Sequence, residues 1–325
     1  MKEKILKLLR TTEKYISGEE MSSLLGVSRT AIWKHIKALK QQGYQIESKS
    51  GYGYHLIDEK EHINKEELNI IIHQLGDFFT EVEYFDQIDS TNTYAKSLKH
   101  RRNTLIVANE QLMGRGRLGR DWKSESGQGI YMTLKIHPDL MPSEAVNMTQ
   151  IMALAAVRAL KKLYDDDVLI KWPNDIVFKG KKIAGILTEM TTELNQINQL
   201  IIGMGININQ DSFDGELENK AVSLKQIMDK EISKLQLIKQ ILSEFIKLYN
   251  EFVIHRNLEF VIDEINNYSS VVGKEIIAID KGKIYNYKAE YIDKDGRLIV
   301  KDDKGKYKEL LFGEISVRSK DGYSE

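Results

Sequence analysis

The spacing of apolar residues changes twice along the chain, and this constrains the fold more than any other sequence feature. Residues 4–56 show short helical patterns that end in strand-like runs. From Ile63 to about Tyr268 strand-like and helical runs alternate, and from Val271 short alternating runs are separated by turn residues. With 42% hydrophobic residues each segment can form a core. We therefore predict a multidomain α+β protein with domains at 1–62, 63–270 and 271–325.

The first segment has the pattern of a winged helix-turn-helix. A short amphipathic helix at residues 4–10 is followed by a Ser17-Gly18 break and a second helix. Gly26-Val27-Ser28 then forms a tight turn in which Ser28 is placed to cap a third helix. Two short strand patterns after Gly43 predict a hairpin, which would be the wing.

The outer face of the third helix carries cations and hydrogen-bonding groups. Our DNA-binding candidates there are Arg29, Thr30, Trp33, Lys34 and Lys37. Residues 1–60 hold 11 of the 47 lysines and arginines but only 7 of the 48 acidic residues, which leaves 36 against 41 for the rest. Because cations neutralise phosphates, this surplus favours nucleic-acid binding, with an ordinary solvated face as the alternative.

The lack of cysteine and of a long apolar segment excludes several kinds of site and indicates the cellular compartment. The chain has no cysteine, which excludes disulfides, cysteine zinc sites, thiol nucleophiles and iron–sulfur ligation. The charged N-terminus lacks a signal-peptide apolar region, and the longest apolar stretches are well below the roughly 18 residues of a membrane span. We expect a soluble, cytoplasmic protein with no membrane partner.

Residues 114–119, GRGRLG, match the dinucleotide-binding expression G-x-G-x-x-G after a strand-like run. The residues that follow are turn formers and then another strand, so no helix N-terminus is available for a pyrophosphate. A Rossmann site is therefore not expected. Arg115, Arg117 and Arg120, interleaved with these glycines, instead predict a cationic loop that closes over an anionic ligand, with a basic surface loop as the alternative.

Three later strand patterns also carry polar residues or glycines at their ends or within them. Residues 171–175, KWPND, end one strand, and Asp175 is either a magnesium or cation partner or part of a plain turn. Lys182 begins a buried strand. Gly203 and Gly205 punctuate another strand, where missing side chains let a ligand or another backbone lie flat on the sheet.

The C-terminal segment contains repeated hairpin-turn signals, including Asp293-Lys294-Asp295-Gly296 and Asp302-Asp303-Lys304-Gly305. Roughly five short strands follow one another there. Because an open sheet of this size would leave edges and an apolar face uncovered, we predict a small β-barrel.

Taken together, these segments closely resemble the biotin protein ligase family. The matching segments, in the family's order, are Ser90-Thr91-Asn92, Gln111, GRGRLGRDW (114–122), KWPND (171–175), KKIAGIL (181–187) and GMGININ (203–209). With the winged helix in front and GEISVR (313–318) behind, the whole chain is similar to the bifunctional bacterial ligases that also repress the biotin operon.

The resemblance implies a central mixed sheet with flanking helices, similar to class II aminoacyl-tRNA synthetases, and an SH3-like C-terminal barrel. It implies that biotin, ATP and Mg²⁺ give biotinoyl-5′-AMP and pyrophosphate, after which a lysine of an acceptor displaces AMP. The implied acceptors are biotin carboxyl carrier domains of biotin-dependent carboxylases. Bound biotinoyl-AMP would favour a homodimer that binds operator DNA.

The resemblance also assigns candidate site residues. Lys182, Arg117 and Arg115 are the catalytic candidates, because cations must offset the repulsion between two anions. The biotin-binding candidates are Ser90, Thr91, Asn92, Gln111, Arg115, Gly116, Arg117, Lys182 and Gly185. The nucleotide-binding candidates are Arg117, Trp122, Lys171, Asn174, Asp175, Lys182, Asn207 and Arg318, with Asp175 as the metal candidate.

Two other functions fit parts of the sequence. One is a ligand-sensing repressor without ligase turnover. The other is a lipoate protein ligase, which shares the central fold and the adenylation chemistry. The leading winged helix and trailing barrel, together with KWPND and GRGRLG, favour biotin over lipoate.

Overall fold

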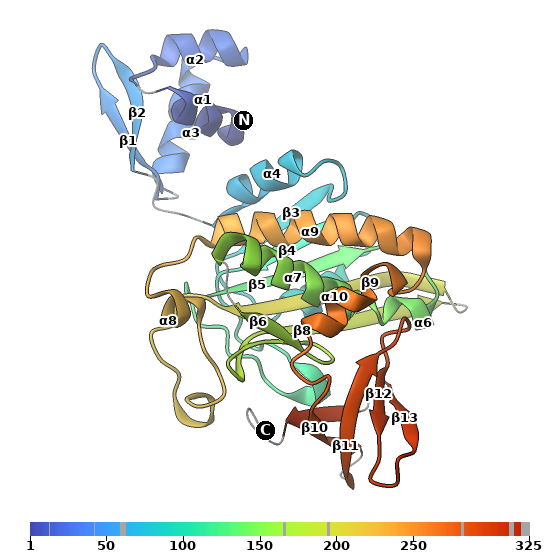
Figure 1. Cartoon of the computed structure of the whole chain (residues 1–325). Helices are drawn as coiled ribbons and strands as arrows, with labels where there is room; N and C mark the ends of the chain where they lie inside the picture. Colours follow the sequence, from blue (N-terminus) through green and yellow to red (C-terminus); the bar gives the residue numbers. More distant parts are fainter. Residues whose placement is uncertain are drawn as a thin grey trace. The chain divides into compact units, whose positions relative to one another are not determined.

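The computed structural model describes residues 1–12, 14–41, 43–58, 63–164, 167–193, 196–280, 283–311 and 315–319, with the backbone alone for Asp58, Asp280 and 315–319. Contacts between residues divide the chain into two compact units, Met1–Gly76 and Asp77–Glu325 (Figure 1). Among the described residues, none of the helices combines the length and apolar character needed to span a membrane.

The first unit begins with three helices and a hairpin, as predicted. The elements are α1 (Lys2–Thr11), α2 (Gly18–Leu25), α3 (Arg29–Gln41), β1 (Gln45–Lys49) and β2 (Gly53–Asp58). Ser17 caps α2 by accepting the Glu20 N–H, and Ser28 accepts the Ala31 N–H at 3.2 Å at the start of α3. The strands β1 and β2 pair antiparallel. This arrangement confirms the predicted helix-turn-helix with a following hairpin.

Helix α4 (Lys65–Gln74) also belongs to this unit, although its residues follow the boundary expected at 62. Its Glu67 is buried and lies 2.8 Å from Arg10 Nη2 of α1. The Tyr44 hydroxyl donates to the same carboxylate and accepts from Asn64 Nδ2 at 3.0 Å. Burial raises the pKa of Tyr44 above its usual value, which keeps this hydroxyl protonated as a donor.

We expect Glu67→Ala to lower the free energy of unfolding of the first unit by about 3 kcal/mol, because the variant removes the buried carboxylate that Arg10 and Tyr44 both contact. Hydrogen exchange of the amides in α1 and α3 measures this loss. The control is Glu66→Ala, which breaks a pair with Lys2 nearer the surface and costs about 0.5 kcal/mol. Equal losses in the two variants would contradict a special role for Glu67.

The second unit is built on a mixed seven-stranded sheet in the order β3-β4-β5-β9-β8-β7-β6. The strands are β3 (Glu81–Phe85), β4 (Thr104–Ala108), β5 (Gly129–Ile136), β6 (Val168–Lys171), β7 (Asp175–Phe178), β8 (Lys181–Glu193) and β9 (Gln196–Asn207). Strands β3 and β4 are parallel, whereas the other neighbouring pairs are antiparallel. The predicted mixed sheet is thus confirmed.

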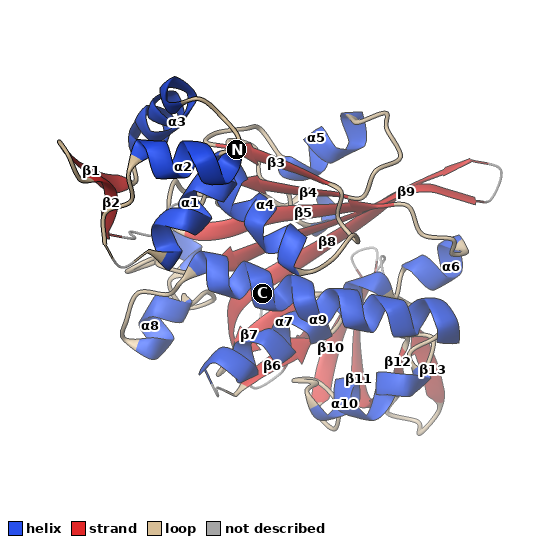
Figure 2. Ribbon diagram, turned by 90° about the horizontal axis from the view of Figure 1, so that it is seen from above, coloured by secondary structure: helices blue, strands red, loops and turns tan. Residues whose placement is uncertain are grey.

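Helices cover both faces of this sheet (Figure 2). Helix α5 (Thr91–Ser97) lies on one face, and α7 (Met148–Tyr164) and α9 (Lys234–His255) lie on the other. The unit also contains α6 (Pro142–Ala145), α8 (Leu224–Met228) and α10 (Ile262–Asn267), and short 3-10 turns at Arg117–Gly119, Gly215–Leu217 and Glu259–Val261. Successive side chains of β8 show the two faces: Thr188 bonds Thr149 of α7 at 2.7 Å, and Glu189 pairs with Lys96 of α5.

The apolar spacing from Val146 to Leu163, with Ser143 as a possible N-cap, predicts one long helix, but the structure has two. Residues Pro142–Ala145 form the separate short helix α6, in which Glu144 accepts the Met141 N–H at 2.8 Å. Helix α7 begins only at Met148. The apolar periodicity was continuous across both helices, so it did not reveal the break between them.

A five-stranded antiparallel sheet completes the unit, in the order β13-β12-β11-β10-β14. Its strands are β10 (Glu275–Asp280), β11 (Lys283–Ile292), β12 (Leu298–Lys301), β13 (Tyr307–Leu310) and β14 (Ile315–Ser319). Ile276, Ala289 and Val300 are buried in its core. The sequence-based prediction of about five short strands is confirmed.

Candidate functional site

Two adjoining cavities lie on the α5 side of the central sheet. The smaller cavity has a volume of about 50 Å³ and the larger about 890 Å³. The smaller is lined by Ser90, Thr91, Asn92, Gln111, Arg115 and Gly185, the larger by Lys171, Asp175 and Asn207, and both by Gly116, Arg117, Trp122, Asn174 and Lys182. All predicted ligand-site residues thus come together, except Arg318, whose side chain lies outside the described residues.

Hydroxyl and amide groups fill one end of the smaller cavity. The Thr91 N–H and hydroxyl donate to Gln111 Oε1 at 2.9 and 3.0 Å. Thr133, which sequence reasoning missed, places its hydroxyl 2.8 Å from Thr91 Oγ1 and 2.7 Å from Asn92 Oδ1. These buried contacts give the site a fixed polar end that suits a small uncharged polar ring.

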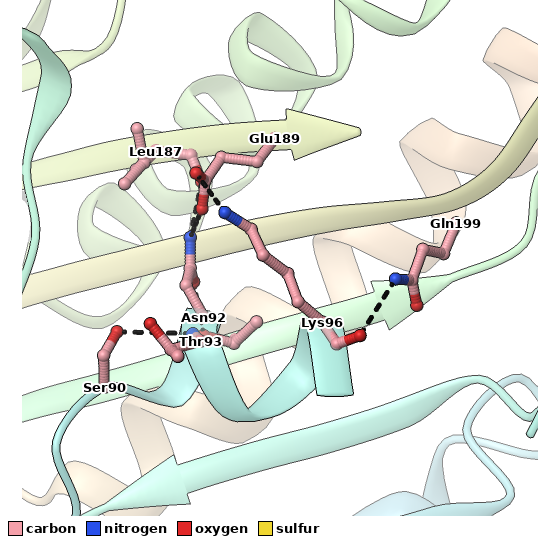
Figure 3. Close-up of polar contacts among 8 residues, drawn as sticks. Ser90, Asn92, Thr93, Lys96, Leu187, Glu189 and Gln199 are labelled. Atoms are coloured by element: carbon pink, nitrogen blue, oxygen red, sulfur yellow. Dashed lines mark hydrogen bonds and ion pairs between the residues drawn. The ribbon is translucent and has the colours of Figure 1, made fainter. Parts of the chain in front are cut away.

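An ion pair between α5 and β8 holds Asn92 in position (Figure 3). Asn92 Nδ2 donates to Glu189 Oε2 at 2.9 Å and to the Leu187 carbonyl oxygen at 3.3 Å. Lys96 Nζ lies 2.6 Å from the other oxygen of Glu189. Glu189 was not predicted as a site residue, because nothing in the local sequence marks it.

Glycines on β9 let side chains lie against the floor of the site. A Cβ atom at Gly203 would stand 2.2 Å from Asn92 Oδ1, and one at Gly205 would stand 2.3 Å from the Trp122 indole. A side chain at either position would therefore force Asn92 or Trp122 to move. The sequence predicted that a ligand or a backbone would lie flat on this strand, and in the structure the Trp122 indole lies there.

Cations converge where the two cavities meet. Lys182 Nζ lies 2.8 Å from Asp175 Oδ1 and 5.1 Å from the centre of the Trp122 ring. Arg117 Nη1 donates to Asn174 Oδ1 at 2.8 Å. Burial lowers the pKa of Arg117, an effect that Asp175 partly opposes, and a guanidinium keeps its charge in either case. The junction therefore suits an anionic group.

The KWPND segment positions these cations from the sheet. Asn174 Nδ2 donates to the Ile186 carbonyl oxygen at 3.0 Å, and the Ile186 N–H donates back to the Asn174 carbonyl at 2.9 Å. Asp175 begins β7 and is the register partner of Gly185 on β8. The contact with Arg117 comes from the short 3-10 turn of the GRGRLG loop, and no helix follows that loop before β5, as the sequence predicted.

The residues present do not form a protein cage for a metal ion. No group of three or more His, Cys, Asp or Glu side chains is arranged to bind a metal within the described part of the chain. Asp175, the predicted candidate, has one carboxylate oxygen paired with Lys182. A single carboxylate of this kind fits magnesium only when phosphates and waters supply the other ligands.

In the first unit, all five predicted DNA-binding residues are exposed on α3. The Trp33 side chain is 52% exposed although it is large and apolar. Lys37 Nζ lies 5.4 Å from the centre of its ring. Because α3 also buries Ile32 and Ile36 in the core of the unit, its outer face is presented on a rigid support.

Comparison with known proteins gives matches along the whole chain. The model of the biotin/lipoate A/B protein ligase family matches residues 84–207, a helix-turn-helix domain model matches 2–55, and a biotin protein ligase C-terminal domain model matches 271–318. The solved structure of biotin protein ligase from Aquifex aeolicus in complex with biotin and ATP is 27% identical, with a TM-score of 0.66, and the match covers 74% of this chain and 100% of that one.

Two relatives match over nearly their whole length. The bifunctional ligase/repressor BirA of Bacillus spizizenii is 35% identical over 298 residues, which is 90% of each chain. The protein of the same name from Escherichia coli is 30% identical over 337 residues, which is 97% of each chain. The chain therefore belongs to the bifunctional ligase/repressor group of the biotin protein ligase family.

Proposed function

We propose that this chain activates biotin with ATP, transfers it to a lysine of a carrier protein, and represses transcription by binding operator DNA. The observation that carries the enzymatic part is the convergence of Lys182 and Arg117 between the two cavities. The relatives named as ligase/repressors, matched over 90% and 97% of their lengths, support both parts.

In the first step a carboxylate oxygen of biotin attacks the α-phosphorus of ATP. A bond forms between that oxygen and phosphorus, the bond from phosphorus to the bridging oxygen breaks, and pyrophosphate leaves. In the second step the lysine nitrogen attacks the acyl carbon of biotinoyl-AMP. The amide forms, AMP leaves, and the amine gives up a proton. Neither step needs a nucleophile from the protein, which agrees with a chain that has no cysteine.

The proposed residue roles follow from charge. Lys182 and Arg117 are the catalytic residues that offset the repulsion between the biotin carboxylate and the α-phosphate, with Arg115 joining them from the exposed rim. The ring system of biotin occupies the polar end of the smaller cavity, which is lined by Ser90, Thr91, Asn92 and Gln111. Gly116 and Gly185 line the rest of the biotin site in the same cavity. The nucleotide occupies the larger cavity beside Trp122, Lys171, Asn174, Asp175 and Asn207, with Arg318 as a further contact.

Magnesium is expected to enter with the phosphates of ATP, which supply the oxygen ligands that the protein lacks. In that complex Asp175 would contribute one carboxylate.

We infer a three-domain division at 1–62, 63–270 and 271–325, in which α4 packs against the first domain although it follows the boundary at 62. We also infer a central domain similar to class II aminoacyl-tRNA synthetases and an SH3-like closure of the C-terminal sheet. The family matches to all three segments support this division. We further propose a cytoplasmic protein that binds biotin carboxyl carrier domains and forms a homodimer when biotinoyl-AMP is bound.

Transfer of labelled biotin to a purified biotin carboxyl carrier domain tests the enzymatic proposal. We expect a labelled carrier lysine when the full chain, ATP and Mg²⁺ are present. Lipoate in place of biotin, with a lipoyl carrier domain as acceptor, should give no product. A product from lipoate alone would support lipoate ligation instead, and biotin binding without any transfer would support a sensor that has lost turnover.

Lys37→Ala should weaken operator binding and lower the slope of log affinity against log salt by about one, because one phosphate contact is lost. The measurement is operator binding by the full chain, with its adenylate bound, over a range of salt concentrations. Lys7→Ala on α1 removes an exposed cation outside α3 and is the control. The same change of slope in both variants would argue against α3 as the contacting helix.

A further inference from the structure

Two turns of the C-terminal sheet have the same internal hydrogen bonds. Residues 293–297 form the turn between β11 and β12, and residues 302–306 form the turn between β12 and β13. In each, the glycine N–H donates to the carbonyl of the first aspartate at 2.9 Å, and that aspartate's N–H donates to the last residue's carbonyl at 3.0 Å. The aspartate carboxylate also accepts two backbone N–H groups in both turns. The glycines, Gly296 and Gly305, have φ angles of +77° and +80°.

The surroundings of the two turns differ. The Gly296 carbonyl accepts a hydrogen bond from Gln150 Nε2 at 2.7 Å and another from Trp172 Nε1 at 3.0 Å. A Cβ atom at Gly296 would stand 2.3 Å from Asn147 Oδ1. At Gly305 the nearest atom to such a Cβ would be Lys301 Cε, at an ordinary 3.7 Å. The first turn is therefore docked on the central domain, whereas the second makes no comparably close approach.

The docked turn contacts Trp172, and the two side chains that contact Arg117 and Lys182 come shortly after Trp172 in the chain. Trp172 is 1% exposed, and both donors to the Gly296 carbonyl are buried. Two residues along the chain Asn174 accepts from Arg117, and the next residue, Asp175, pairs with Lys182. Because buried hydrogen bonds leave an indole ring little freedom, the position of the KWPND segment depends on the Gly296 carbonyl.

We propose that Gly296 and Trp172 are positioning residues for the adenylation step, through which the C-terminal sheet sets where Arg117 and Lys182 stand. This inference rests on the proposed function of those two cations. It predicts that displacing the turn affects the reaction at phosphorus more than the binding of biotin. The polar end of the biotin cavity is held separately by Thr133 and Glu189.

Gly296→Ala tests the proposal, because the methyl group meets Asn147 and pushes the turn away from the central domain. We expect kcat for biotin-dependent pyrophosphate release to fall about tenfold or more, since small displacements of reacting groups have large effects on rate. The Kd for biotin without ATP should change about twofold or less. This split between kcat and binding separates a positioning role from a general loss of folded protein.

Gly305→Ala is the matched control, because it places the same methyl group on an equivalent turn with the same positive φ but without the clash. Its kcat should stay within about twofold of the wild-type value. Adding Asn147→Gly to Gly296→Ala removes the nearest atom but leaves Gln150 Nε2 at 2.9 Å from the new Cβ atom, so it should restore part of kcat. Trp172→Phe keeps an aromatic ring, removes the N–H donor and should lower kcat without changing biotin binding, which provides a second test if Gly296→Ala fails to fold.

Equal kcat values for Gly296→Ala and Gly305→Ala would overturn the proposal, as would an unchanged kcat in Trp172→Phe. These outcomes differ from a failure of the proposed function. In that case the wild-type chain itself would release no pyrophosphate with biotin and ATP.

Discussion

Lys182→Ala should lower the rate of biotinoyl-AMP formation about 100- to 1,000-fold, the range found when one preorganised donor to a developing negative charge is removed. Lys182 Nζ is held between Asp175 and the face of Trp122, at the junction of the two cavities. No second lysine on this strand faces the junction among the described residues, because the preceding Lys181 bonds the Glu218 carbonyl instead. Single-turnover release of pyrophosphate measures the effect.

Lys181→Ala is the control for this variant. Lys181 is adjacent on β8 and carries the same charge, but its Nζ lies 3.2 Å from the Glu218 carbonyl oxygen outside both cavities. The rate should stay within about twofold of wild type. Circular dichroism checks that both variants fold. Unchanged pyrophosphate release in Lys182→Ala would remove Lys182 from the mechanism.

Gly205→Val should weaken biotin-dependent adenylation about 10- to 100-fold, because a side chain at this position displaces the Trp122 indole into the space that the ligands need. Even the Cβ atom alone would stand 2.3 Å from the indole. Overpacking a well-filled site costs about 1–3 kcal/mol, which corresponds to the stated range. The readouts are the Kd for biotin and the rate of pyrophosphate release.

Ile202→Leu is the control on the same strand. Ile202 is fully buried, lines neither cavity, and is the register partner of Thr188, which bonds Thr149 of α7. This substitution nearly conserves volume and should change both readouts about twofold or less. If the two variants behave alike, close packing of Trp122 on the glycine does not shape the site.

The order of the helices and strands could be predicted from the sequence, because each of these elements has a local sequence pattern. Ser28 caps α3 as expected, and the β1–β2 hairpin follows Gly43. The placement of α4 could not be predicted in this way. Its first residues lie in a run of charges that is typical of a linker, and nothing local shows that Glu67 is buried against Arg10, 57 residues earlier in the chain.

Residues of the candidate site could be predicted where they belong to short sequence motifs. Residues that reach the site only through contacts between distant parts of the chain could not. Arg117, Trp122 and Lys182 belong to motifs and line the cavities. In contrast, Glu189 meets Asn92 across 97 positions, and Gly296 meets Trp172 across 124. A strand glutamate and a turn glycine have no local signal of function, so only the folded chain shows which side chains they position.

In the proposed reaction Lys182 and Arg117 allow the carboxylate of biotin to react with the α-phosphate of ATP. The most direct test is mass spectrometry of the intact chain under conditions that retain noncovalent ligands, after incubation with biotin, ATP and Mg²⁺. We expect a complex heavier than the chain by one biotinoyl-AMP, with one pyrophosphate released for each complex formed, and loss of both signals in Lys182→Ala. A complex with biotin alone and no pyrophosphate would contradict it.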